Sequence, residues 1–100
     1  MMLHPKVQEL LDSLRALQAH LSRYDEFWAA NVQVASDEIA RSDAHGLQRF
    51  LGYFGGMGSL NDLVLHDAGD PLGSENDQLE ALRHRAWELA QNLRGEITMR

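Results

Sequence analysis

The residues most suggestive of chemistry lie in the glycine-rich segment 54–63, whose sequence is FGGMGSLNDL. Glycine-rich loops that lead into a helix are typical of phosphate sites, because free backbone N–H groups at a helix N-terminus bind anions. The Walker pattern, however, requires a lysine between its last glycine and its serine, and here Ser59 follows Gly58 directly. A dinucleotide-binding loop would follow a strand, whereas an apolar helical pattern precedes this segment.

The charge of the surrounding chain also argues against phosphate. Residues 50–82 contain no Lys or Arg and six acidic residues. We therefore expect residues 54–59 to form a tight corner between two helices, in which glycine supplies backbone conformations with positive φ. Ser59 and Asp62 match a capping box that starts a short helix over residues 60–64. The residues of this structural motif are Gly55, Gly56, Gly58, Ser59, Asn61 and Asp62.

Catalytic and metal-binding patterns are missing from the sequence. Ser59 lacks the Gly-x-Ser-x-Gly context of a nucleophile elbow, because Asn61 occupies the place of the second glycine. Asn61 is expected to cap or cross-link the loop instead. There is no cysteine, and no two of the five histidines have the spacing that binds a metal on one helical face. His84 and Glu88, four residues apart, are expected to form a surface pair. We predict neither an enzyme nor a cofactor.

The net charge points to a class of partner. One hundred residues with a net charge of −6 and 44% hydrophobic residues indicate one acidic globular domain, residues 1–100. Nucleic-acid binding requires a basic face, so this charge disfavours it. It favours long-range attraction to a basic protein instead. The N-terminus shows neither a signal peptide nor a membrane span, and we expect a cytoplasmic protein.

Trp87 is a second candidate for partner binding. It lies about 130° from the centre of the apolar stripe of its helix. With Arg83 on the same side, it has the composition of an interface hot spot. The alternative is that Trp87 packs on residues 54–65 with Arg83 stacked on its ring, and we favour this arrangement because large aromatic side chains are usually buried. The candidate partner surface consists of Asp62, Asp67, Asp70, Glu75, Asp77 and Trp87.

Apolar residues recur at three- and four-residue steps along most of the chain, which predicts helices. The first helix begins at Pro5, a residue suited to the first helical turn, and its apolar stripe ends at Leu21. The last helix runs from Glu75–Arg94, is started by a second capping box in residues 74–77, and is ended by Gly95. The apolar residues of this helix recur at alternating three- and four-residue steps, which predicts nearly antiparallel packing against another helix, such as the first.

Two more helices precede the glycine corner. The second begins near residues 24–26 and carries two apolar stripes, the smaller one formed by Phe27 and Val34. We therefore expect it to be the central element and to be covered on two sides. The third helix is capped at residues 42–43, contains two glycines that weaken it, and leads into the corner. Residues 66–73 are dense in turn residues and predict a loop, without any strand.

The segment 54–63 resembles the signature of a family of small uncharacterised bacterial proteins. In that pattern a tryptophan-bearing helix, an acidic turn and an apolar helix precede Gly-Gly-Met-Gly-Ser-[Leu/Phe]-Asn-Asp-Leu; here these parts resemble residues 28–39, 42–43 and 47–54. The resemblance covers residues 24–95. The family carries a label of unknown function and implies no catalytic residue. It implies short acidic proteins encoded beside secreted or contact-dependent toxins, which suggests an immunity role.

The sequence thus predicts an all-α fold: a compact four- to five-helix bundle-like single domain with a glycine-rich corner at residues 54–59. Three functions stay open. The first is a cytoplasmic immunity or antitoxin protein that blocks a basic toxin, without contact to nucleic acid or membrane. The second is a stand-alone helical interaction or regulatory module, either monomeric or homodimeric. The third is small-ligand binding at the glycine corner.

Overall fold

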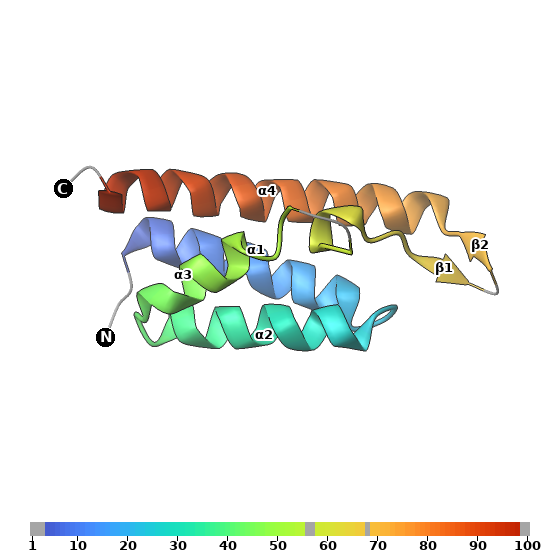
Figure 1. Cartoon of the computed structure of the whole chain (residues 1–100), viewed down its shortest axis with the longest axis horizontal. Coiled ribbons are helices and arrows are strands. Elements are labelled where there is room, and N and C mark those ends of the chain that lie inside the picture. The colour runs from blue at the N-terminus through green and yellow to red at the C-terminus, as the bar shows by residue number, and fades with distance from the viewer. Residues whose placement is uncertain (1–3, 56–57, 68, 99–100) are drawn as a thin grey trace.

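The structure, a computed structural model, describes residues 4–55, 58–67 and 69–98, with residues 97–98 described by their backbone alone. Within these residues the chain forms four α-helices: α1 (Pro5–Leu21), α2 (Glu26–Ala40), α3 (Ala44–Leu51) and α4 (Gly73–Thr98). A one-turn 3₁₀ helix, η1 (Leu60–Asp62), and two short strands, β1 (His66–Asp67) and β2 (Asp70–Pro71), lie between α3 and α4. The prediction of an all-α bundle is confirmed (Figure 1).

The four helices form a ring in which each packs on the next: α1 on α2, α2 on α3, α3 on α4, and α4 on α1. α1 and α4 run antiparallel, as predicted (Figure 1). Ion pairs between Lys6 and Glu96 and between Glu9 and Arg85 join these two helices. Over the described residues, no helix combines the length and the apolar character needed to cross a bilayer.

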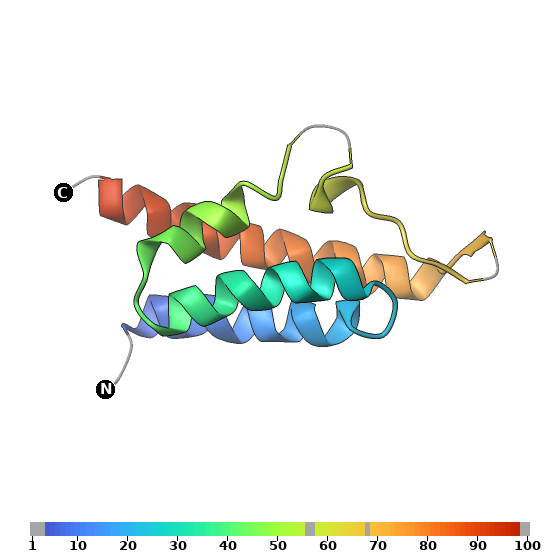
Figure 2. The ribbon, with the colours of Figure 1, turned by 60° about the horizontal axis from the view of Figure 1, so that its bottom comes forward.

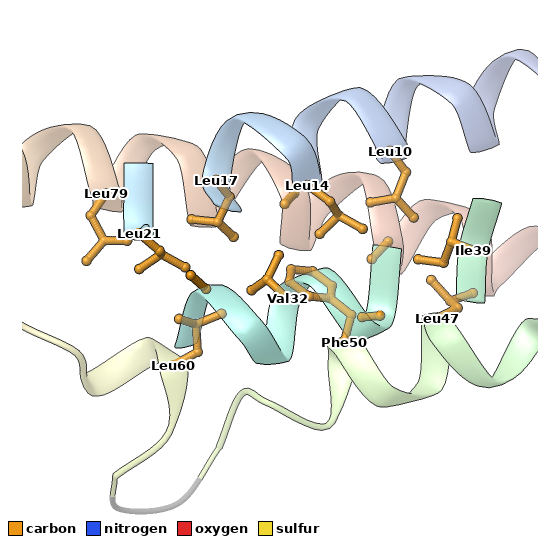
Figure 3. Packing of buried hydrophobic residues seen from close by; sticks show 14 of the residues in the cluster. Leu10, Leu14, Leu17, Leu21, Val32, Ile39, Leu47, Phe50, Leu60 and Leu79 are labelled. Atoms are coloured by element: carbon orange, nitrogen blue, oxygen red, sulfur yellow. The ribbon is translucent and has the colours of Figure 1, made fainter. Parts of the chain in front are cut away.

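One hydrophobic cluster fills the centre of this ring. α1 begins at Pro5, as expected, and contributes one continuous row of buried leucines. Figure 3 shows this row facing apolar side chains of the other helices and of η1. The labelled residues of the cluster are Leu10, Leu14, Leu17, Leu21, Val32, Ile39, Leu47, Phe50, Leu60 and Leu79. The first half of the chain and α4 therefore share a single core, and η1 is anchored in it.

α2 differs from its prediction on one face. It begins where expected, because the side chain of Asp25 accepts a hydrogen bond from the backbone N–H of Trp28 at 3.0 Å. Its main stripe is buried, but Phe27 is 68% exposed and Val34 is 46% exposed. The prediction that α2 is central and covered on two sides is therefore wrong. In a ring of four helices, each helix buries the face turned toward its neighbours and leaves the outer face open.

α3 approaches α2 closely at Gly46. A Cβ atom at this position would lie 2.7 Å from the carbonyl oxygen of Ala35 and 2.9 Å from Cγ1 of Ile39. The glycine weakens the isolated helix by up to about 1 kcal/mol, but it permits this contact between the two helices. The predicted cap is confirmed, since the carboxylate of Asp43 accepts a hydrogen bond from the backbone N–H of His45 at 3.0 Å.

The glycine corner is confirmed as a chain reversal. Gly55 has a φ of 107° and Gly58 has a φ of 76°, in the region that glycine favours. Gly56 lies outside the described residues. The backbone N–H of Leu60 donates to the carbonyl oxygen of Tyr53 at 2.9 Å, which ties the two sides of the corner together.

The capping box predicted at Ser59 is not formed. Ser59 precedes η1, but its side chain makes no capping hydrogen bond, and the helix ends after one 3₁₀ turn at Asp62. Leu63 then has extended backbone angles, with φ −66° and ψ 129°. The local sequence favours a longer helix, whereas contacts with α4 hold the following residues extended.

A small hairpin replaces the loop predicted at residues 66–73. β1 pairs antiparallel with β2, with His66 opposite Pro71 and Asp67 opposite Asp70. The strands are two residues long, too short to show the alternating apolar pattern by which a strand is predicted. The hairpin lies at the opposite end of the molecule from the C-terminal end of α4 (Figures 1 and 2).

α4 is longer than predicted at both ends. It begins at Gly73, so Ser74 lies inside the helix and does not cap it. The backbone N–H of Asn76 donates to the carbonyl oxygen of Leu72 at 2.9 Å. The helix continues through Gly95 to residue 98, which contradicts the predicted stop. The ion pair of Glu96 with Lys6 on α1 favours this continuation.

Candidate protein-binding surface

Two side chains of α4, Asn76 and Arg83, hold the chain between η1 and β1 against this helix, and we call them the α4 clamp. Nδ2 of Asn76 donates to the carbonyl oxygen of Leu65 at 3.0 Å, and the Leu65 N–H donates to Oδ1 of Asn76 at 2.7 Å. Nη1 of Arg83 donates to the carbonyl oxygens of Leu60 at 3.2 Å and Leu63 at 3.1 Å. This chain segment is therefore fixed along the first half of α4 (Figure 2).

The charge of Arg83 is used inside the domain. Its side chain is only 12% exposed, and its Nη2 donates to the carboxylate of Glu80. Its Nε and the hydroxyl of Ser59 are buried without a hydrogen-bond partner among the described residues. Because the guanidinium is turned toward carbonyl oxygens and one carboxylate, it does not offset the acidic residues farther out.

Asp67 and Asp70 face each other across the hairpin. They are directly opposite in the register of β1 and β2, so their side chains share one face of the ladder with Cβ atoms about 5 Å apart. Both are exposed. Neither has an ion-pair or hydrogen-bond partner for its carboxylate within the described part of the chain. Like charges directly opposite destabilise a ladder, so the hairpin holds two uncompensated carboxylates.

The remaining acidic candidates differ in exposure. Asp62 and Asp77 are exposed, and over the described residues their carboxylates are also unpaired. Glu75 is half-buried, and its carbonyl oxygen lies 2.9 Å from Nε2 of His20 at the end of α1. Residues two apart on a helix point about 200° apart, so Glu75 and Asp77 face different ways. We call the four exposed, unpaired carboxylates the acidic surface: Asp62, Asp67, Asp70 and Asp77.

Trp87 borders an open pocket of about 420 Å³ between the glycine corner and α4. The indole is 36% exposed and stacks on His84, with ring centroids 6.5 Å apart and planes at 19°. The expected stacking of Arg83 on this ring is wrong, because the guanidinium binds the carbonyl oxygens of the neighbouring segment. The pocket, at the place considered for a small ligand, is lined by Phe54, Gly55, Asn61, Glu80, Arg83, His84 and Trp87.

The histidines do not gather into a metal-binding group within the described ranges. Among the described residues, no group of three or more His, Cys, Asp or Glu side chains could hold a metal ion. Nε2 of His84 lies 3.0 Å from Oε1 of Glu88 in an exposed pair, as the four-residue spacing predicts.

Three perturbed groups lie on and around α3, away from the acidic surface. Hydrogen bonds from the backbone N–H and ring of His45 lower the pKa of the Asp43 carboxyl. The hydrogen bond to Glu38 raises the pKa of Arg49. Burial raises the pKa of the Tyr53 phenol. The Arg49 and Tyr53 shifts follow from the packing of α3 and the residues after it on α2, whereas the Asp43 shift comes from the N-terminal cap of α3 itself.

Sequence reasoning missed the α4 clamp. Asn76 stood inside the predicted capping box, and Arg83 stood beside Trp87, so both had a local explanation. Their actual partners are backbone groups 11 residues away for Asn76 and 20 and 23 residues away for Arg83. No local pattern signals a side chain whose partner is a distant backbone carbonyl.

One family model matches the chain. No curated protein and no solved structure matches it. The family match covers residues 21–73, more than half of the chain, and includes α2, α3, the glycine corner and the hairpin. It ends where α4 begins, earlier than the expected residue 95. The chain therefore belongs to the family described as Domain of unknown function (DUF6966).

Proposed function

We propose that the domain binds a basic protein through the acidic surface. The observation that carries the proposal is the pair of facing carboxylates, Asp67 and Asp70, which has no cation beside it among the described residues. This pair destabilises the free hairpin, and a cationic side chain from a partner would relieve the repulsion. Asp62 and Asp77 would extend the negative potential and steer the approach of that partner.

The concrete form of this proposal is a bacterial cytoplasmic immunity or antitoxin protein that occludes the active site of a basic toxin. The net charge of −6 supports it, as does the clustering of six acidic residues without a cation in residues 50–82. Complementary charge accelerates association to well above the rate of neutral proteins. Fast capture is what an inhibitor of a toxin requires.

The first experiment identifies the partner and measures its association. The full chain is used to purify binding proteins from the lysate of its native cells, and we expect one stoichiometric basic protein. Its association rate constant should fall steeply as salt is raised. Coexpression of the domain should restore growth to cells that produce this protein. Growth inhibition that the domain does not relieve would contradict the immunity role.

Charge reversal tests the location of the surface. The double variant Asp67→Lys, Asp70→Lys should lower the association rate constant by about tenfold or more, the lower end of electrostatic steering. The matched control changes the net charge equally by placing four lysines at exposed neutral residues away from the hairpin: Ala19→Lys, Gln33→Lys, Gln48→Lys and Asn92→Lys. Equal effects of the two variants would show that net charge alone matters, and the acidic surface would be wrong.

The alternative is a stand-alone helical interaction or regulatory module without a toxin partner. The joint exposure of Phe27 (68%) and Val34 (46%) on one helix favours it, since adjoining exposed apolar side chains, unlike single ones, mark interaction sites. This alternative predicts a captured protein that does not inhibit growth when produced alone. The solution mass of the purified chain, by light scattering, separates its monomeric and homodimeric forms.

A further inference from the structure

A second surface lies on the outer face of α2. Phe27, Ala30 and Val34 are all exposed. Their spacing of three and seven residues places them within about 60° of one another around the helix, in one stripe. The small side chain of Ala30 lies between these two larger neighbours along the helix. This is the arrangement in which one helix accepts a side chain of another helix as a knob.

Aromatic contacts with neighbouring residues hold the Phe27 end of this stripe in place. The ring of Trp28 packs edge-to-face against Phe27 at 5.5 Å and against Tyr53 at 5.4 Å between centroids. The hydroxyl of Tyr53 donates to the carbonyl oxygen of Asn31 at 2.8 Å. These contacts fix the N-terminal half of α2 on the residues that precede the glycine corner. An exposed apolar face that is already ordered loses little conformational entropy when it binds.

One edge of this stripe is negatively charged. Glu26 and Asp37 are both exposed, and α2 contains no Lys or Arg. Eleven residues separate them, so they lie on the same edge of the helix, about 16 Å apart along its axis. Within the described residues neither carboxylate has an ion-pair or hydrogen-bond partner. A partner on this face would therefore meet two unpaired anions beside the apolar stripe.

This charge disfavours a second copy of the chain as the occupant. An antiparallel two-fold pairing that sets Phe27 against Val34 also brings Glu26 of each copy next to Asp37 of the other. Like charges repel in this antiparallel arrangement. A parallel two-fold pairing sets the N-termini of both copies of α2 side by side, where their helix dipoles repel. A membrane surface rich in anionic lipids would be repelled by the same two carboxylates.

We infer that the α2 stripe, defined as Phe27, Ala30 and Val34 with Glu26 and Asp37 at its edge, binds an amphipathic helix of a basic protein. An apolar side chain of that helix packs over Ala30, between Phe27 and Val34. Two Lys or Arg side chains, spaced by about three helical turns, pair with Glu26 and Asp37. This site lies on α2, which carries no residue of the acidic surface, so the inference does not depend on the proposed function.

The test uses two synthetic helical peptides and the full chain. Both peptides carry the same leucine stripe; one has two lysines eleven residues apart on its edge, and the other has two glutamates there. The protein carries Asp67→Asn and Asp70→Asn, which removes attraction to the hairpin. NMR spectra should show that the lysine peptide perturbs the amides around Ala30, with at least tenfold higher affinity than the glutamate peptide.

Two double variants in this background identify the contacts. Phe27→Gln with Val34→Gln should weaken binding of the lysine peptide at least tenfold. Val64→Gln, at an exposed valine outside α2, should leave this binding unchanged. Glu26→Gln with Asp37→Asn should abolish the preference for the lysine peptide, and this variant leaves the packing untouched. Equal binding of the two peptides would overturn the inference. Chemical-shift perturbations by the lysine peptide outside α2 would also overturn it. The same holds if the wild-type chain dimerises, or binds anionic vesicles, and Phe27→Gln abolishes that association.

Discussion

Asn76 of α4 and Leu65 are joined by two hydrogen bonds, one in each direction, although 11 residues separate them in the sequence. The carboxamide of an asparagine can donate and accept at the same time, so it pairs with both backbone groups of one residue as a neighbouring strand would. Leu65 is buried, and without Asn76 its N–H would lack a partner, whereas its carbonyl oxygen also accepts from the Leu72 N–H at 3.0 Å. The asparagine thus allows a single extended stretch to lie on a helix.

Replacing Asn76 by alanine should destabilise the domain. The change leaves the N–H of Leu65 without a partner, whereas its carbonyl oxygen keeps the hydrogen bond from the Leu72 N–H, and an unsatisfied buried polar group costs about 1–3 kcal/mol. We expect a loss of the free energy of unfolding in this range, measured by chemical denaturation, and faster hydrogen exchange at the Leu65 amide. Asn92→Ala, at an exposed asparagine of the same helix, is the matched control and should change stability by less than about 0.5 kcal/mol.

Much of the helical fold could be predicted, because its signals are local. Asp25 and Asp43 precede their helices and accept hydrogen bonds from the first turns. The row of leucines up to Leu21 marks the buried face of α1 by spacing alone. The glycine corner could also be predicted, since positive φ values at Gly55 and Gly58 leave few residue types to choose from.

The errors share one cause, which is that the deciding contact is distant. Ser59 opens a motif typical of a helix start, but Arg83 holds the following carbonyl oxygens and the helix stops after one turn. Phe27 and Val34 have the spacing of a buried stripe, and spacing does not show whether another element covers it. Glu75 is a further case, since it is half-buried and its carbonyl oxygen lies 2.9 Å from Nε2 of His20, 55 residues away in the sequence.

Two helical glycines should respond oppositely to alanine. In Gly46→Ala the new Cβ atom meets the Ala35 carbonyl oxygen at 2.7 Å, so α3 must move away from α2. We expect the free energy of unfolding to fall by about 1–3 kcal/mol, as is typical of overpacking, despite the better helix propensity of alanine. In Gly95→Ala the Cβ atom meets nothing within 4 Å, and stability should rise by up to about 1 kcal/mol. Equal shifts in their thermal midpoints would contradict the close contact at Gly46.

Asp43 should make the stability of the domain fall in acid. Hydrogen bonds from His45 lower the folded-state pKa of this carboxyl below its value in the unfolded chain. The stabilisation is therefore complete above the ordinary aspartate range and is lost as the pH falls through the folded-state pKa. Urea midpoints of the wild type and Asp43→Asn should differ at neutral pH and converge in acid. Asp37→Asn, at an exposed carboxylate without this bond, should show no such convergence.

Replacing Arg83 by lysine should loosen the chain segment after the glycine corner. Lysine keeps the positive charge, but its single ammonium group cannot reproduce the planar fork that reaches Leu60, Leu63 and Glu80 at once. The carbonyl oxygen of Leu60 also accepts from the Leu63 N–H at 3.3 Å, so the main loss falls on the half-buried carbonyl of Leu63, and we expect a loss of about 1 kcal/mol in the free energy of unfolding.

Arg85→Lys, two residues farther along α4, is the control for Arg83→Lys. Arg85 is 61% exposed and pairs with Glu9 at the surface, where an ion pair contributes about 1 kcal/mol or less. Because both changes preserve charge, association with a basic partner should keep its salt dependence in both variants. If Arg83→Lys and Arg85→Lys were equally stable, and hydrogen exchange of the Leu65 amide were unchanged, Arg83 would not act as part of the α4 clamp. The extended segment would then depend on Asn76 alone.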